Sequence, residues 1–391
     1  MKVKLGDIAV LINGDRGRNY PSQADIVPNG DIPFVNAGHL NGKDISFDEM
    51  NYISQEKFDR LNSGKFCKGD ILYCLRGSLG KKAVVRDIIN GAIASSLVII
   101  RPNAEKVNVD YLMFALDSQS IQEQLIKANN GSSQPNLSAA SVRGYDIDLP
   151  ERDVQEKVVA KLSKVSELID LRKRQLAKLD ELVKSRFVEM FGDPVSNPMG
   201  WKKRNLKDVC SKLNDGTHFS PESFETGEYK YVTAKNIKLS GFDFSNITYI
   251  PEEVHRPIYE RCNPEYGDVL YIKDGATTGV AMVNTLEEEF TLLSSVALLK
   301  QNRDIMNGYF LTALLNNEDM YLDIRNNMGG AAITRLTIAK LNAIKVIVPP
   351  IDIQNQFGEF VKQLDKSKAV VQQSLDKLET LKKSLMQEYF G

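Results

Sequence analysis

The chain has 391 residues, 42% of them hydrophobic, and its 50 Lys and Arg against 51 Asp and Glu give a formal net charge of −1. This length and composition predict a soluble globular protein of two domains plus helices, and they exclude a disordered chain. No run approaches about 18 uninterrupted apolar residues and the N-terminus lacks a signal-peptide pattern, so we expect a cytoplasmic protein that does not contact a membrane.

Strand-like runs alternate with polar, Gly-rich loops through residues 1–150, which we predict to form a first β-rich domain. The runs are IPFVNA, DILYCL, AIASSLVII and YDIDLP, and one helix is expected over residues 110–127. Asp70 follows a glycine just before a strand, a place where Asp commonly closes a turn. A structural role is therefore favoured for this carboxylate over acid–base catalysis.

Residues 151–192 are predicted to form one long helix, preceded by Pro150 and ended by Phe-Gly-Asp-Pro at 191–194. Apolar residues recur in it at alternating spacings of four and three, over about four heptads. Such a 3.5-residue repeat is typical of a coiled-coil seam, which we favour over an amphipathic helix lying on its own domain. The seam consists of Val158, Leu162, Val165, Ile169, Leu176, Leu179 and Val183, with Arg172 in its polar slot.

The second half of the chain repeats the first. KLDELVKSRFVEMFG at 178–192 and KLETLKKSLMQEYFG at 377–391 are identical at eight of fifteen positions, at an offset of 199. Upstream, GDILYCLRG at 69–77 matches GDVLYIKDG at 267–275, and there the offset drifts between 197 and 201. Helices that pair in register keep their length, whereas loops tolerate insertions. The predicted fold is therefore α+β with an internal repeat. It consists of a first domain at 1–150, a spacer helix at 151–192, a second domain at 193–349 and a second spacer helix at 350–391. Within the second domain we expect strands and one helix over residues 308–326.

The second spacer helix carries a matching seam, and we expect the two seams to pair with each other. Because the second domain begins soon after the first helix ends, the second helix can lie along the first only by running back. The pair is thus an antiparallel coiled coil with pseudo-two-fold symmetry. About 34 residues at about 1.5 Å each predict a spacer of ~50 Å between the two domains. Its seam consists of Phe357, Val361, Leu364, Val371, Leu375, Leu378 and Leu385, with Lys368 and Lys382 in the polar slots.

Candidate DNA-binding residues lie in the polar loops of both domains. Asn, Gln, Arg, Lys, Ser and Thr are side chains that contact phosphates and base edges, and the two copies present different sets of them. With a net charge near zero, DNA binding requires basic residues gathered on one face, or partner subunits that neutralise phosphates. The candidates are Arg16, Arg18, Asn36, His39, Arg76, Lys81, Lys82, Ser133, Gln134, Asn136, Thr217, His218, Lys235, Asn236, Lys273, Thr277, Thr278 and Arg335.

No catalytic or metal-ligating motif is found. RGSLGKK at 76–82 is not a Walker loop, and HExxH, GxSxG and a GxGxxG after a strand are absent. The four cysteines form no CxxC pair and the three histidines are scattered, so no metal site is predicted. Asn-Pro-Met-Gly at 197–200 lacks the second Pro and the aromatic residue of an amino-methyltransferase motif, and we interpret it as a turn. These absences favour a protein that is not an enzyme by itself.

Taken together and in this order, the motifs resemble those of the DNA specificity subunit of type I restriction–modification systems, over essentially the whole chain. The motifs are Gly-Asp-x-Leu at 69–72 and 267–270, Gly-Ser-Ser-Gln-Pro-Asn-Leu-Ser at 131–138, Leu-Pro followed by Gln-Glu at 149–156, and Phe-Gly-Asp-Pro. The second copy departs from the pattern at 330–337, where Ile-Thr-Arg replaces Gln-Pro-Asn.

The resemblance implies that each domain is a target-recognition domain that reads one half of a bipartite, asymmetric sequence in double-stranded DNA. It implies that the helices set the half-site spacing and dock two methyltransferase (modification) subunits, which restriction (translocase/nuclease) subunits join. S-adenosylmethionine, ATP and Mg²⁺ would then bind those partners, and this chain would bind no cofactor. Near-neutral charge keeps open an alternative, a two-headed scaffold that binds proteins without DNA specificity.

Overall fold

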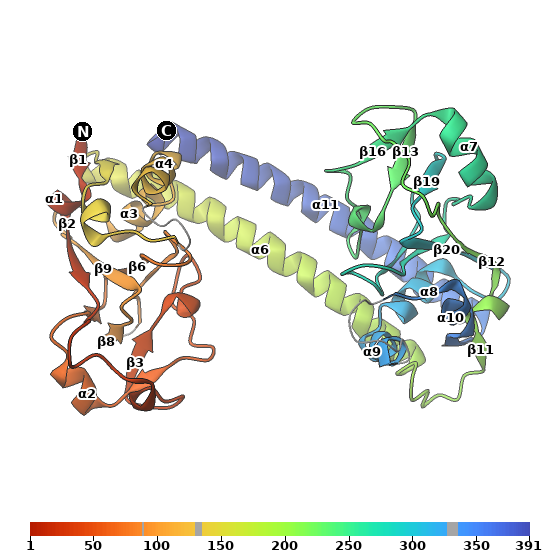
Figure 1. The fold of residues 1–391 in the computed structure, drawn as a ribbon, viewed down its shortest axis with the longest axis horizontal. Coiled ribbons are helices and arrows are strands. Elements are labelled where there is room, and N and C mark those ends of the chain that lie inside the picture. The colour runs from red at the N-terminus through yellow and green to blue at the C-terminus, as the bar shows by residue number, and fades with distance from the viewer. Residues whose placement is uncertain (88–89, 130–134, 327–334) are drawn as a thin grey trace. The chain divides into compact units, whose positions relative to one another are not determined.

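The computed structural model describes residues 1–87, 90–129, 135–326 and 335–391. The chain divides into two compact units, shown in Figure 1: unit 1 comprises Met1–Leu171 and Ser374–Gly391, and unit 2 comprises Arg172–Gln373. Each unit therefore holds one β-rich domain and a part of both long helices, which confirms the predicted α+β class and tandem arrangement. None of the described helices combines the length and apolar character needed to cross a membrane.

Unit 1 is built on two four-stranded sheets. The first is antiparallel, in the order β2 (Ala9–Asn13), β9 (Leu97–Pro102), β6 (Ile71–Cys74) and β7 (Lys82–Val84). The second has the order β4 (Tyr52–Ile53), β3 (Ile32–Val35), β8 (Asn90–Ile93) and β5 (Lys65–Cys67), with β3 and β8 parallel. Strand β1 (Lys2–Lys4) pairs with β10 (Asp146–Asp148). The short helices are α1 (Leu5–Ile8), α2 (Gln55–Arg60), α3 (Val109–Ala115), α4 (Gln119–Ala128) and α5 (Ala139–Arg143), with 3₁₀ turns at Gln23–Asp25 and Ala37–His39.

Unit 2 repeats this plan. Its antiparallel sheet has the order β12 (Cys210–Asp215), β20 (Val296–Gln301), β17 (Val269–Ile272) and β18 (Ala281–Val283). The other sheets are β16 (Thr248–Ile250), β13 (Tyr229–Val232) and β19 (Phe290–Leu292); β14 (Ile237–Lys238) with β15 (Gly241–Phe242); and β11 (Lys203–Asn205) with β21 (Lys345–Ile347). The short helices are α7 (Glu252–Arg261), α8 (Gly308–Leu315), α9 (Glu318–Asn326) and α10 (Ile338–Ala343), with 3₁₀ turns at Leu206–Asp208 and Ala234–Asn236.

Both faces of the central strand β6 are buried, which explains why its sequence is apolar throughout. Ile71 and Tyr73 point into the core that the helices of unit 1 share. Leu72 and Cys74, on the other face, pack into a second core beneath the neighbouring sheet. Successive side chains of a strand point to opposite faces, so two cores require a continuous apolar run. Strand β17 divides its residues between two cores in the same way.

The single helix predicted over residues 110–127 is two helices, α3 and α4, so that prediction was wrong. The Ser118 hydroxyl accepts a hydrogen bond from the backbone N–H of Ile121 at 3.3 Å and caps a new helix. In unit 2 the prediction over residues 308–326 fails likewise: α8 ends before Asn317, whose side chain accepts from the N–H of Met320 at 3.1 Å. The apolar pattern continues through both breaks, and only the polar cap marks them.

The two long helices are α6 (Arg152–Phe191) and α11 (Ile351–Phe390), each of 40 residues. A buried glutamine fixes the start of each helix to its own domain. Gln155 accepts from the N–H of Asn108 at 2.8 Å and donates to the carbonyls of Pro150 and Lys106. Gln354 makes the same three bonds, to Asn307, Pro349 and Ile305. This duplicated clamp accounts for the Leu-Pro…Gln motif.

The helices pair in antiparallel fashion within each unit. In unit 1 the beginning of α6 shares a core with the end of α11, including Leu162 and Phe390. In unit 2 the end of α6 packs on the beginning of α11, with Phe191 and Phe357 5.5 Å apart between ring centroids. Each domain is thus completed by the last turns of the other repeat's helix. All predicted seam residues are buried or half-buried, and positions outside the seam, such as Leu171 and Val370, are exposed.

Candidate nucleic-acid interface

The candidate loops of unit 1 meet at one edge of its first sheet. Strand β2 ends and β9 begins at this edge, where Asn13 pairs with Val98, and β6 ends there as well. The returning segment 135–138 joins them: Asn136 forms a β-bridge with Arg76, and the N–H of Gly77 donates to the carbonyl of Pro135 at 3.2 Å. Four segments far apart in the sequence therefore form one surface.

Unit 2 assembles the same four segments at the matching edge. Strand β12 ends at Asp215 and β17 ends at Ile272, both beside the start of β20. Arg335 forms a β-bridge with Asp274, as Asn136 does with Arg76 in unit 1. The repeat therefore duplicates the architecture of this edge and changes the side chains on it.

The Gly-Asp carboxylates lie at the opposite end of the central strands, away from these loops. Asp70 accepts from the N–H of Cys67 at 2.8 Å and binds the guanidinium of Arg101 through two hydrogen bonds of 2.8 Å. Asp268 accepts from the N–H of Glu265 at 2.9 Å and pairs with Lys300 at 3.4 Å. Both carboxylates therefore close turns, the role expected from the sequence.

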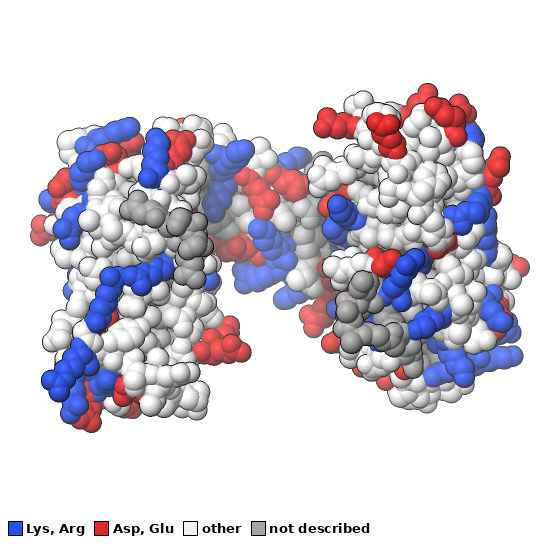
Figure 2. All heavy atoms as spheres, viewed as in Figure 1, with Lys and Arg blue, Asp and Glu red and all other residues white. Residues whose placement is uncertain are grey.

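Ten candidate side chains reach the surface. Lys and Arg side chains form an oblique row across the face of unit 1 shown in Figure 2, and in unit 2 they lie in smaller, separate groups. Ser133 and Gln134 lie outside the described residues. The exposed candidates are Arg16, Arg18, Arg76, Asn136, His218, Lys235, Thr277 and Arg335. The half-buried candidates are Asn36 and Lys81.

Six candidates are buried, so the prediction that they contact DNA directly is not supported. They are His39, Lys82, Thr217, Asn236, Lys273 and Thr278. Their side chains instead hold the loops: His39 Nδ1 accepts from the N–H of Asn36 at 3.1 Å, and Lys82 pairs with Asp117. A polar residue in a Gly-rich loop is expected to be exposed, but a long side chain such as that of Lys82 turns inward when a carboxylate pairs with it.

The loop after β2 in unit 1 is fixed by a buried carboxylate. Asp15 accepts from the N–H groups of Gly17 at 2.7 Å and Asn62 at 2.8 Å, and these hydrogen bonds lower the pKa of its carboxyl group. The Arg16 guanidinium reaches the carbonyl of Ser95 at 3.4 Å, across the same edge. A rigid loop thus presents exposed guanidinium groups, the side chains best suited to phosphates and to guanine.

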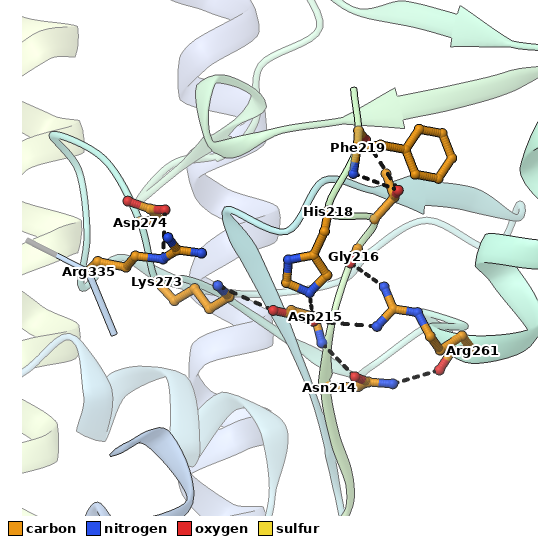
Figure 3. A network of polar contacts seen from close by, with 10 residues as sticks. Asn214, Asp215, Gly216, His218, Phe219, Arg261, Lys273, Asp274 and Arg335 are labelled. Carbon is orange, nitrogen blue, oxygen red and sulfur yellow. Dashed lines mark hydrogen bonds and ion pairs between the residues drawn. The ribbon is translucent and has the colours of Figure 1, made fainter. Parts of the chain in front are cut away.

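The corresponding edge of unit 2 contains a charge cluster, drawn in Figure 3. Asp215 lies 3.3 Å from Lys273 Nζ, 3.6 Å from Arg261 Nη1 and 3.2 Å from His218 Nε2. Arg335 pairs with Asp274 at 3.4 Å nearby. The sequence did not indicate Arg261, because it lies in the last turn of α7, 45 residues from the loop it contacts.

Among the residues that the structure describes, no group of three or more His, Cys, Asp and Glu side chains is arranged to hold a metal ion. The exposed polar groups at the two edges are mainly guanidinium, amide and imidazole groups, and the carboxylates of Asp15, Asp215 and Asp274 hold the loops or these cations in place. Such an arrangement suits binding of a polyanion and recognition of base edges.

The sequence matches the family described as "Type I restriction modification DNA specificity domain" twice, over residues 1–181 and 198–380. The chain belongs to this family. It therefore contains two specificity domains, which accounts for the internal repeat, and its role in DNA specificity confirms the prediction from the sequence. The scaffold alternative is not favoured. Specificity subunits are non-catalytic members of complexes with other restriction–modification subunits and DNA.

Specificity subunits are also found among the individual relatives. The type I restriction enzyme MjaIX specificity subunit of Methanocaldococcus jannaschii is 23% identical over 355 residues, covering 86% of this chain and 80% of that protein. The EcoBI specificity subunit of Escherichia coli is 23% identical over 231 residues, covering 54% of this chain and 48% of that protein.

Solved structures show the same fold. The type I restriction–modification S subunit from M. genitalium has a TM-score of 0.63 at 17% identity, covering 100% of this chain and 96% of that chain. A chain from a structural study of complex assembly and conformational transition of the type I restriction–modification system has a TM-score of 0.56 at 19% identity, covering 100% of this chain and 97% of that chain.

Proposed function

We propose that this chain is the specificity subunit of a type I restriction–modification complex in which each unit reads one half of a bipartite, asymmetric target in double-stranded DNA. One observation carries the proposal: both units assemble the same four segments at the same sheet edge, with different side chains. Arg76 and Asn136 face each other across the bridge in unit 1, whereas Asp274 and Arg335 do so in unit 2. One scaffold with two sets of side chains would recognise two different sequences.

We further propose that the helices set the half-site spacing and dock two methyltransferase subunits. Exposed apolar residues on α6 recur on α11 at an offset of 199: Leu171 with Val370, and Leu182 with Leu381. Equivalent apolar positions on both helices support two equivalent docking sites. Restriction subunits would join this assembly, and S-adenosylmethionine, ATP and Mg²⁺ would act in those partners rather than in this chain.

Exchange of residues 1–150 for the corresponding domain of another specificity subunit tests the proposal. We expect the exchange to change one half of the methylated motif and to leave the other half and the spacing unchanged. The measurement is genome-wide mapping of methylated bases in cells that carry the hybrid chain and its methyltransferase subunits. A motif that changes in both halves, or that is not split, would contradict the assignment of one half-site to each unit.

Replacing Arg76 and Lys81 by alanine should weaken DNA binding by the assembled complex and reduce its salt dependence. If both side chains neutralise phosphates, the slope of log K against log salt concentration becomes less steep by about one for each residue, and the sequence preference stays unchanged. Lys106→Ala is the matched control, since Lys106 is an exposed cation beyond the opposite end of β9. A changed sequence preference would instead assign these side chains to base recognition.

A further inference from the structure

Unit 2 has a buried ion pair where unit 1 has two uncharged residues. By strand register, Asp215 at the end of β12 takes the place of Asn13 at the end of β2. Lys273 takes the place of Leu75. The backbone N–H of Lys273 donates to the carbonyl of Ser295 at 2.9 Å, and that of Leu75 donates to the carbonyl of the equivalent Ser96 at 2.8 Å. Both members of the pair therefore occur only in unit 2, although the backbone of this edge is arranged in the same way in the two units.

Fold stability does not explain this pair. The Asp215 and Lys273 side chains are 6% and 2% exposed, and desolvating two charges offsets much of their mutual attraction. In unit 1, Asn13 and Leu75 complete the same turn without an ion pair, and the buried Asp15 carboxylate two residues further on is satisfied by the backbone N–H groups of Gly17 and Asn62. A buried ion pair that the scaffold does not require indicates that the carboxylate serves another purpose.

The same carboxylate orients two exposed side chains, as Figure 3 shows. The Asp215 carboxylate contacts Nη1 of Arg261 and Nε2 of His218 through one oxygen, Oδ1, while Lys273 contacts the other, Oδ2. Arg261 also donates through Nη2 to the carbonyl of Gly216, which fixes its guanidinium at two points. Yet the side chains of Arg261 and His218 are 44% and 59% exposed. Contacts with Asp215 and Gly216 therefore hold these two side chains in place, while their exposed surfaces remain available to a ligand.

A guanidinium group fixed in this way is suited to read a base. A free Arg side chain loses considerable rotational freedom when it binds, and much of that loss is avoided when the protein already holds it in place. The commonest specific contact to DNA in the major groove is Arg with the O6 and N7 acceptors of guanine. The Asp215 carboxylate would repel a DNA phosphate, so its role is to position the side chains of Arg261 and His218.

We propose that Asp215, anchored by Lys273, is a positioning residue that directs Arg261 at the O6 and N7 edge of a guanine in the half-site read by unit 2, with His218 at its side. This inference rests on the proposed function of unit 2. Among the described residues of unit 1, Asn13 and Leu75 stand where the ion pair would be, so recognition by unit 1 would use the exposed guanidinium groups of its own loops.

The test uses the full chain assembled with its methyltransferase subunits, and measures methylation rates on targets substituted one base at a time. Arg261→Lys keeps the charge and the buried pair but loses the planar donors. We expect it to reduce discrimination at one guanine position of one half-site by roughly 5- to 150-fold, with the other half-site unaffected. Arg256→Lys is the matched control, because Arg256 lies on the same helix and pairs with Glu252 and Glu289.

The positioning role is tested by the double variant Asp215→Asn with Lys273→Leu, which introduces the residues of unit 1 and leaves no unpaired buried charge. We expect it to relax the same guanine position while the thermal unfolding temperature of unit 2 stays close to that of the parent chain. Adding Arg261→Lys to it should relax that position little further, since the two changes remove one interaction.

Three outcomes would overturn the inference. The first is a half-site for unit 2 without guanine, and the second is an unchanged preference in either variant. The third is a uniform loss of binding in Arg261→Lys across all sequences with a weaker salt dependence, which would make Arg261 a phosphate contact. Failure of the proposed function itself is recognised separately, because the parent chain would then direct no split motif.

Discussion

Replacing Phe191 by alanine is expected to destabilise unit 2 by about 3–5 kcal/mol, the usual cost of removing a fully buried aromatic ring. Phe191 is fully buried, and its ring lies 4.6 Å from that of Phe310, 5.2 Å from Phe187 and 5.5 Å from Phe357. These rings come from α6, α8 and α11, so the cavity would weaken the docking of both long helices on the domain at once.

Denaturant unfolding of the full chain, followed by hydrogen exchange resolved along the sequence, measures this effect. The protected amides of unit 2 should exchange faster, and those of unit 1 much less so. Val188→Ala is the control on the same helix, since Val188 is 50% exposed and its truncation should change stability by less than about 0.5 kcal/mol. Equal effects of the two substitutions would contradict the proposed role of the aromatic cluster.

The reciprocal arrangement extends this reasoning to unit 1. Phe390 occupies the position of Phe191 in the second repeat, and its ring lies 5.2 Å from that of Tyr111. Each unit is thus stabilised by the end of a helix that begins in the other unit. The two specificity domains are therefore coupled through covalent continuity of the helices, and neither can be completed by its own repeat alone.

The long helices were predictable because their pattern is both periodic and duplicated. Val165, Ile169, Val371 and Leu375 are each less than a tenth exposed, as the 3.5-residue repeat required. The pattern depends only on residues close in sequence, and the constant offset of 199 restricts the helix lengths. The equivalence of strands β6 and β17 is likewise predictable from the sequence, because both carry the Gly-Asp-x-Leu-Tyr pattern.

The recognition edge was predictable as a set of loops but not as a set of contacts. Arg261 reaches Asp215 only because α7 returns to the sheet edge, and no local pattern records that return. Lys82 and Lys273 are buried because Asp117 and Asp215 receive them, and such pairing depends on tertiary structure. The sequence identifies which polar loops lie at this end of the sheet, whereas the positions of the carboxylates determine which side chains are exposed and which are buried in ion pairs.

Insertion of four residues in both helices, after Gln175 and after its repeat equivalent Ser374, is expected to lengthen the spacer of the split target motif. Four helical residues add about 6 Å, which corresponds to roughly two base pairs at 3.4 Å each. The two insertions keep the helices equal in length, so both ends still dock: Gln155 and Phe191 in α6, and Gln354 and Phe390 in α11.

A single insertion after Gln175 should have a different result. The added length then has no counterpart in α11, so the end of α6 is displaced relative to the aromatic core of unit 2, and we expect loss of assembly rather than a longer spacer. Methylation mapping in cells distinguishes the outcomes, and the same four residues inserted after Glu287, in an exposed loop, serve as the control that should leave the motif unchanged. If the double insertion left the spacing unchanged, the helices would not set it, and the distance between half-sites would have to be determined by the methyltransferase subunits.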